Sequence, residues 1–248
     1  MNDKCNALIL KQTDYRENDA LILAYCENYG LLTFVARGIR KMSSKNAGSL
    51  FPFTLSELLF DYTEGKDMFA LHSAHMISSY RSLQSNLTKS AAAGVIVELT
   101  SIVGREISQD EEERAYLYEL LKTVLSEMDQ SSDFVLALSL FLSNVLSLLG
   151  ISPEVDGCAV CGNTKVVAIS VEQGGFVCSK CANGKSEDVS LLKQFRLINK
   201  ARAEHMATLR QFAPYPFAIA EYLYQFLNTY LSVQLKSWDF LKEINMLK

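Results

Sequence analysis

The chain has 248 residues, of which 49% are hydrophobic and 21% are charged, and it contains only four prolines. This composition excludes a disordered or collagen-like chain and suffices for one large domain or two to three small ones. Because 24 basic and 28 acidic residues give a net charge of −4, any contact with nucleic acid requires a local basic patch.

Short apolar runs make up the first 78 residues. Five of them have the length of strands, at residues 7–10, 20–25, 31–36, 54–60 and 68–72. Glycine and proline breaks at about every ten to fifteen residues favour a small antiparallel sheet or barrel over βαβ units. Five strands suggest the OB-fold among small barrels, but the number of strands does not fix the topology.

The loop between the third and fourth predicted strands, residues 36–49, concentrates positive charge and has no acidic residue. Its cations are Arg37, Arg40, Lys41 and Lys45. Its serines and glycines would let the chain follow a phosphate backbone, with Lys11 and Arg16 extending the patch. A solvated basic loop without a ligand explains the same residues equally well.

Four aromatic residues near this loop could stack on bases, although most aromatics of a small barrel belong to its core. They are Tyr15, Phe34, Phe51 and Phe53.

The hydrophobic period becomes that of helices at about residue 79. One helix follows the acidic turn at 110–113 and carries apolar residues from Leu117 to Met128. A second runs from about 133 to 149 and ends at Gly150, and a third begins near Pro216 and extends to about 231.

A cysteine cluster lies between the second and third helices. Two CxxC pairs, separated by sixteen residues, have the spacing of a four-cysteine zinc site, and the residues between them read as a β-hairpin. The four expected ligands are Cys158, Cys161, Cys178 and Cys181. Four thiolates leave no open coordination position, so we expect structural zinc rather than catalytic zinc. Redox dithiols are the alternative, and Cys5 and Cys26 are expected to be buried hydrophobes.

A second basic stretch lies beyond the cysteines, between residues 191 and 212. Its cations are Lys193, Arg196, Lys200, Arg202 and Arg210, opposed only by Glu204. It could bind DNA or an acidic partner, but a helix surface with a charge bias is the simpler interpretation.

No common catalytic motif occurs. HExxH, GxSxG and GxGxxG are absent, and Ser179 replaces the leading glycine of a P-loop before the Asn-Gly-Lys-Ser segment that ends at Ser186. The apolar stretches are too short for a membrane span of roughly 18 residues, and no secretory signal begins the chain. We expect a cytoplasmic protein that is not an enzyme and does not enter membranes.

The order of several short motifs resembles the RecO family of bacterial recombination mediators over nearly the whole chain. The N-terminal motifs are ALIL at 7–10, YREND at 15–19, YGL at 29–31, ARGIRK at 36–41 and LFPF at 50–53. The C-terminal ones are the segment 141–153, which ends in LGISP, and CAVCG at 158–162. Some members of the family lack the metal ligands.

The resemblance implies an α+β chain. It implies an N-terminal five-stranded OB-fold barrel (1–78) that would bind DNA, and an α-helical domain (79–248) with an inserted four-cysteine zinc ribbon (154–186). It also implies that the protein binds single- and double-stranded DNA and anneals complementary strands. Its implied partners are RecR, in some systems RecF, the C-terminal tail of single-strand-binding protein and, indirectly, RecA, with nucleoid association during repair. The alternative from another class is a zinc-stabilised adaptor that recruits repair proteins without touching DNA.

Overall fold

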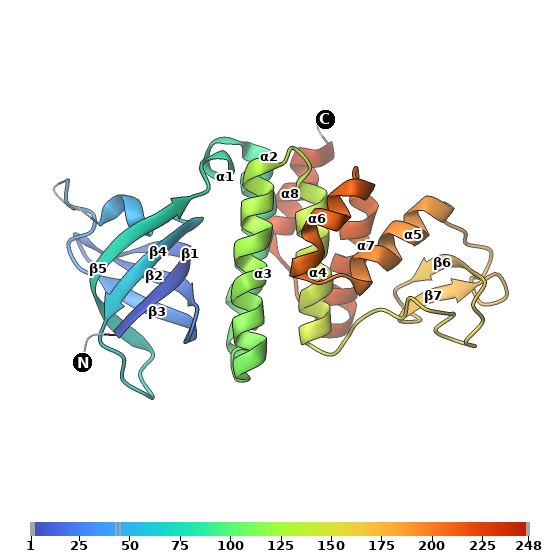
Figure 1. Ribbon diagram of the computed structural model, residues 1–248, viewed down its shortest axis with the longest axis horizontal. Coiled ribbons are helices and arrows are strands. Elements are labelled where there is room, and N and C mark those ends of the chain that lie inside the picture. Colours follow the sequence, from blue (N-terminus) through green and yellow to red (C-terminus); the bar gives the residue numbers. More distant parts are fainter. Residues whose placement is uncertain (1–2, 43, 45, 247–248) are drawn as a thin grey trace. The chain divides into compact units, whose positions relative to one another are not determined.

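The computed structural model describes residues 3–42, 44 and 46–246 (Figure 1). The chain forms two compact units, Met1–Gln130 with Ser237–Lys248, and Ser131–Lys236. Three helices and the C-terminal helix therefore group with the strands. The predicted division at residues 78 and 79 marks only the change from strands to helices, and the domain boundaries stay a prediction.

Five strands form the closed barrel of the first unit (Figure 1). They are β1 Asp3–Tyr15, β2 Asp19–Cys26, β3 Gly30–Ala36, β4 Thr54–Phe60 and β5 Met68–Ser79, with a short 3-10 turn, η1, at Ala47–Leu50. Their order is β1-β2-β3-β5-β4, and β3 pairs with β5 in parallel, whereas the other neighbours are antiparallel. This arrangement confirms the predicted five-stranded, OB-like barrel.

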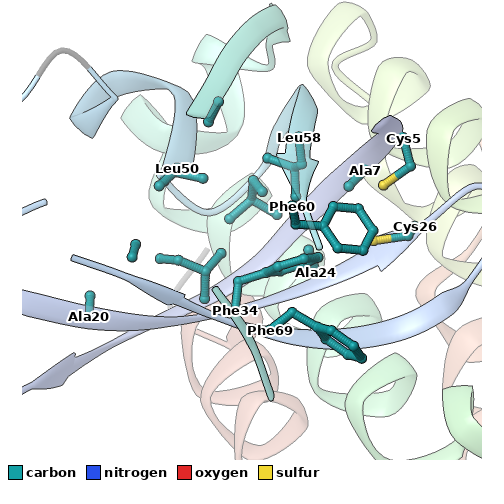
Figure 2. Close-up of a cluster of buried hydrophobic side chains, with 14 of the residues drawn as sticks. Cys5, Ala7, Ala20, Ala24, Cys26, Phe34, Leu50, Leu58, Phe60 and Phe69 are labelled. Carbon is teal, nitrogen blue, oxygen red and sulfur yellow. The ribbon is translucent and has the colours of Figure 1, made fainter. Parts of the chain in front are cut away.

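Aromatic side chains fill the barrel, as Figure 2 shows. The ring of Phe34 lies 5.0 Å from that of Phe60 and 6.2 Å from that of Phe69, measured between centroids. β2 contributes small residues such as Ala20 and Ala24, which leave room for these rings. Cys5 and Cys26 are buried at one end of the same cluster, as expected of small hydrophobes.

Four helices complete the first unit. They are α1 Arg81–Ser85, α2 Leu87–Ile107, α3 Glu111–Gln130 and α8 Lys236–Met246. The carboxylate of Asp110 accepts hydrogen bonds from the backbone N–H groups of Glu112 and Glu113, at 2.9 and 3.0 Å, and so caps the start of α3. The predicted helix with an acidic first turn is confirmed.

Helix α2 is long and, on average, apolar. Its 18-residue window has a mean hydropathy of 1.3, so by length and composition it could cross a membrane. However, 56% of that window is buried inside the structure, and core helices of folded proteins pass the same test. The uninterrupted apolar runs stay short, as expected, because Glu98 and several polar residues interrupt the helix, and the window reaches this hydropathy only as an average.

The barrel is held on α2 by a close contact at Gly30. The phenol of Tyr25 is fully buried and lies 2.9 Å from the hydroxyl of Ser108, at the C-terminal cap of α2. Burial raises the pKa of Tyr25 to about 12, so the phenol stays protonated and can also donate to the carbonyl of Arg114 at 3.3 Å. A Cβ on Gly30, whose φ is +68°, would lie 2.5 Å from the Cβ of Ser108.

The second unit is built on the buried helix α4. Its elements are α4 Phe134–Leu148, β6 Val166–Ser170, β7 Gly175–Cys178, α5 Val189–Lys200, η2 Ala203–His205, α6 Met206–Leu209, η3 Arg210–Phe212 and α7 Phe217–Leu231. α4 packs against α7 and α5, and β6 pairs with β7 as the predicted hairpin. Gly150 takes the left-handed conformation after α4, at φ +72°, as the predicted helix end requires. The helices expected at 133–149 and 216–231 are thus confirmed.

We predict that Gly30→Ala lowers the free energy of unfolding more than Gly65→Ala does. Both glycines have positive φ, but a Cβ on Gly65 meets nothing within 4 Å, so only the conformational cost of about 1–2 kcal/mol applies there. The overlap with Ser108 should add about 1–3 kcal/mol for Gly30→Ala. Urea unfolding of the two variants measures the difference, and equal losses would show that the barrel does not depend on this contact.

Candidate nucleic-acid interface and metal centre

The β1–β2 turn is hydrogen-bonded to the segment that follows β3. The N–H of Gly38 donates to the carboxylate of Asp19 at 2.8 Å, and the N–H of Arg40 donates to the carbonyl of Asn18 at 3.1 Å. The guanidinium of Arg40 also lies 3.2 Å from the carboxylate of Asp14. These bonds fix the first part of the basic loop against the end of β1.

A shallow depression of about 450 Å³, called here the loop depression, lies between these two segments. It is lined by Arg16, Glu17, Asn18, Asp19, Arg37, Gly38 and Lys41. Within the described part of the chain, the exposed cations Arg16, Arg37 and Lys41 form no ion pair with a carboxylate. They therefore remain available to an external anion, although Glu17 and Asp19 reduce the net positive charge.

The structure brings half of the predicted cations together. Arg16, Arg37 and Lys41 share the loop depression, while Arg40 is paired with Asp14. Lys11 is exposed on β1, outside the depression, and Lys45 lies outside the described residues.

Lys11 belongs to a strip of the barrel's outer surface whose side chains are exposed or partly exposed. The strip, called here the open face, is formed by Lys11, Thr13, Leu21, Leu23, Thr33, Val35, Met68 and Ala70. Their registers place them in neighbouring rows, Lys11 beside Leu23 and Thr33 beside Met68, on the side opposite the buried Phe34 and Phe69. The face combines partly exposed aliphatic side chains with one cation.

The four aromatic residues considered for base stacking differ in their exposure. Phe34 is fully buried in the barrel core, as expected for most aromatics of a small barrel, and is not a base contact. Phe51 is 54% exposed, and the guanidinium of Arg16 lies 5.1 Å from the ring centre of the half-buried Tyr15. Phe53 is partly buried and has a φ of +62°. Tyr15 directly precedes Arg16, which lines the loop depression.

Sequence reasoning missed the aliphatic part of the open face. In β2, Leu21 and Leu23 alternate with Ala20, Ile22 and Ala24, so both faces of the strand are apolar. The barrel interior takes Ala20, Ile22 and Ala24 and leaves the leucines outside, so neither hydrophobicity nor size marks the outer face of this strand.

The four predicted cysteines converge in the second unit. Their Sγ atoms all lie within 4.8 Å of one another, and the sulfur of Cys161 is 3.7 Å from that of Cys178 and 3.9 Å from that of Cys181. Each CxxC pair sits on a tight turn, in which the N–H of Gly162 donates to the carbonyl of Cys158 and that of Cys181 to Cys178. The hairpin β6–β7 and these turns position the four thiols to bind a metal ion.

The four crowded sulfurs shift one another's pKa values in opposite directions. Backbone N–H groups, first that of Cys178, lower the pKa of Cys158 to about 6, whereas the adjacent sulfur of Cys178 raises the pKa of Cys181 to about 12. Four thiolates this close repel one another, and a divalent ion removes the conflict. An all-sulfur, closed donor set is the chemistry that structural Zn²⁺ sites use.

The second basic stretch is partly neutralised by the segment that precedes the cysteines. Arg196 and Lys200 on α5 contact the carboxylate of Asp156 at 2.8 and 2.6 Å. These hydrogen bonds, first that from Lys200, lower the pKa of Asp156. Arg202 lies 4.0 Å from Glu204, and Lys193 is exposed. Two of the five cations therefore link α5 to the cysteine module.

Comparisons with known proteins cover almost the whole chain. The family model described as "Recombination protein O N terminal" matches residues 1–80, and "Recombination protein O C terminal" matches residues 84–239. The chain is similar to the DNA repair protein RecO of Halalkalibacterium halodurans, with 23% identity over 98% of this chain and 96% of the relative. It is also similar to the RecO protein of Listeria innocua, with 26% identity over 99% of this chain and 98% of the relative.

We predict that Cys161→Ser abolishes metal binding, because it removes one of four ligands from a closed site. The buried Cys5 of the barrel provides the control Cys5→Ala. Elemental analysis of the purified proteins should find one metal ion per chain in the wild type and in Cys5→Ala, and close to none in Cys161→Ser. Retention of a full complement of metal by Cys161→Ser would contradict the four-thiolate site.

Proposed function

Because the chain belongs to the RecO family of DNA repair proteins, we propose that it binds DNA through the open face and the loop depression of its barrel. The single observation that carries the proposal is the adjacency of these two surfaces on β1, β2 and β3. The loop depression holds three cations without carboxylate partners among the described residues, and the open face begins on the same strands. One unpaired strand could thus place its phosphates on the loop depression and its bases on the open face at the same time.

The two surfaces suit different parts of a nucleotide. Arg16, Arg37 and Lys41 would contact phosphates, which supplies affinity without sequence preference. Leu21, Leu23 and Tyr15 would pack against bases, which is tolerant of sequence because every base has an apolar face. OB-fold barrels bind oligonucleotides on this side, across their second and third strands.

Neighbouring carboxylates weaken the electrostatic attraction between the loop depression and DNA phosphates. Glu17 and Asp19 line the same depression, and Asp14 pairs with Arg40. The net charge of −4 adds no long-range attraction. We therefore expect binding that is local and lost readily as salt concentration rises.

Within DNA repair, we assign the chain a role that requires no chemical step of its own. Neutralising phosphates lowers the repulsion between complementary single strands, so that annealing needs neither nucleotide hydrolysis nor a catalytic residue. On the family resemblance we also expect cooperation with RecR, in some systems with RecF, and contact with the tail of single-strand-binding protein during RecA loading. These steps would take place in the cytoplasm at the nucleoid.

The metal is proposed to be zinc with a structural role. Cys158, Cys161, Cys178 and Cys181 would hold it, and the ion would supply folding free energy to a hairpin too small for a core of its own. The salt bridges of Asp156 to α5 would then attach this module to the helices of its unit.

We predict that the triple variant Arg16→Ala, Arg37→Ala and Lys41→Ala weakens single-strand binding and flattens its salt dependence. If Lys11 and these three cations each neutralise one phosphate, the log–log slope of affinity against salt is roughly −3 in the wild type and roughly −1 in the variant. Fluorescence anisotropy with a labelled oligothymidylate measures both slopes. The control Arg105→Ala, Lys165→Ala and Lys193→Ala removes the same charge from exposed positions elsewhere.

Equal slopes for the wild type and the loop-depression variant would place the DNA site elsewhere on the chain. The absence of any DNA binding by the wild type, both alone and with RecR, would favour the zinc-stabilised adaptor.

A further inference from the structure

A groove of about 380 Å³ lies in the second unit between the hairpin strand β6 and the helix α7. It is lined by Ile169, Ser170, Val171, Glu172, Lys185, Glu187, Ala218, Glu221, Tyr222 and Gln225. None of these residues belongs to the cysteine cluster or to the barrel. The groove therefore needs an explanation of its own.

The hydrogen bonds of β7 show which edge of β6 faces the groove. The N–H of Phe176 donates to the carbonyl of Glu154, and the carbonyl of Phe176 accepts from the N–H of Ala159, both at 2.8 Å. Both polar groups of Phe176 thus point away from β6. Since Ile169 is paired with Phe176, this is a non-hydrogen-bonded pair, and the N–H and C=O of Ile169 point away from β7.

This outer edge of β6 is occupied on both sides of Ile169 but not at Ile169. The N–H of Glu187 donates to the carbonyl of Val167 at 2.8 Å, and the hydroxyl of Tyr230 donates to the carbonyl of Val171 at 2.9 Å. Within the described residues, no hydrogen bond satisfies the backbone groups of Ile169 on that side. Ile169 is only 4% exposed, and buried peptide groups are normally hydrogen-bonded.

The side chains around the edge carry a net negative charge. Glu172, Glu187 and Glu221 line the groove, and Lys185 is the one cation among its lining residues. The hydroxyl of Tyr222 donates to the carboxylate of Glu187, which keeps that carboxylate at the groove wall. A ligand that satisfies both the free edge and the carboxylates must offer backbone donors and acceptors together with positive charge.

We propose that the groove binds an extended, lysine- or arginine-containing segment of a partner protein, one residue of which pairs with Ile169 between the occupied carbonyls of Val167 and Val171. This residue would hydrogen-bond to the free N–H and C=O, and alternate basic side chains of the segment would reach the carboxylates of Glu172 and Glu221. The site is independent of the DNA surface proposed on the barrel, so either can fail without the other.

The test uses the full metal-loaded chain without DNA and a fluorescein-labelled peptide, Lys-Val-Lys-Thr-Lys-Val-Lys. Anisotropy should show binding of this peptide and none of a matched peptide with Glu in place of each Lys. Glu221→Gln should raise the Kd about two- to fivefold, the range of one exposed charge pair, whereas Glu64→Gln in the β4–β5 loop should leave it unchanged. Hydrogen exchange of the Ile169 amide should slow when the peptide is bound.

Three results would overturn the proposal. The first is the absence of binding by the lysine peptide, and the second is an equal effect of Glu221→Gln and Glu64→Gln. The third is an unchanged exchange rate of the Ile169 amide at saturating peptide, because attraction by charge alone would not protect a strand edge.

Discussion

Parallel pairing of β3 with β5 closes the barrel, and this closure determines which side chains are left for function. The register that aligns Phe34 with Phe69 turns both rings inward, where they meet Phe60. The same register turns Thr33 and Met68 outward on the open face. A shift by one residue would exchange the two sets, expose the aromatic core and bury polar groups. The folding of the first unit and the composition of its outer surface are therefore set by the same hydrogen bonds.

The outer surface of the barrel serves two purposes because helices cover only part of it. At one end, Tyr25 packs against Gly104 and Ser108 of α2, and its buried phenol anchors the barrel. At the other end, the strands lead into the loop depression, where the bond between Gly38 and Asp19 holds the cations in place. The residues of the proposed DNA site are therefore held in fixed positions by the barrel. A flexible single strand would bind along this surface and would not be enclosed by it.

The sequence predicted the strands, three of the helices and the cysteine cluster, because each has a local signal. Alternation and turn residues mark the strands, and the CxxC spacing marks the metal site. The pairing of Arg40 with Asp14 could not be predicted, since it depends on how the β1–β2 turn meets the segment after β3. The outward position of Leu23 was likewise hidden, because β2 is apolar on both faces. The free edge at Ile169 appears only once the partners of β7 are known.

Photocrosslinking tests the central claim, that unpaired DNA lies on the open face of the barrel, most directly. The photoreactive amino acid benzoylphenylalanine is placed in turn at Leu23, on the open face, and at Lys193, on the exposed surface of α5. With a labelled single-stranded oligonucleotide, we expect a crosslinked product from the position of Leu23 and little or none from that of Lys193. Crosslinking confined to the position of Lys193 would contradict the account and assign DNA to the second basic stretch.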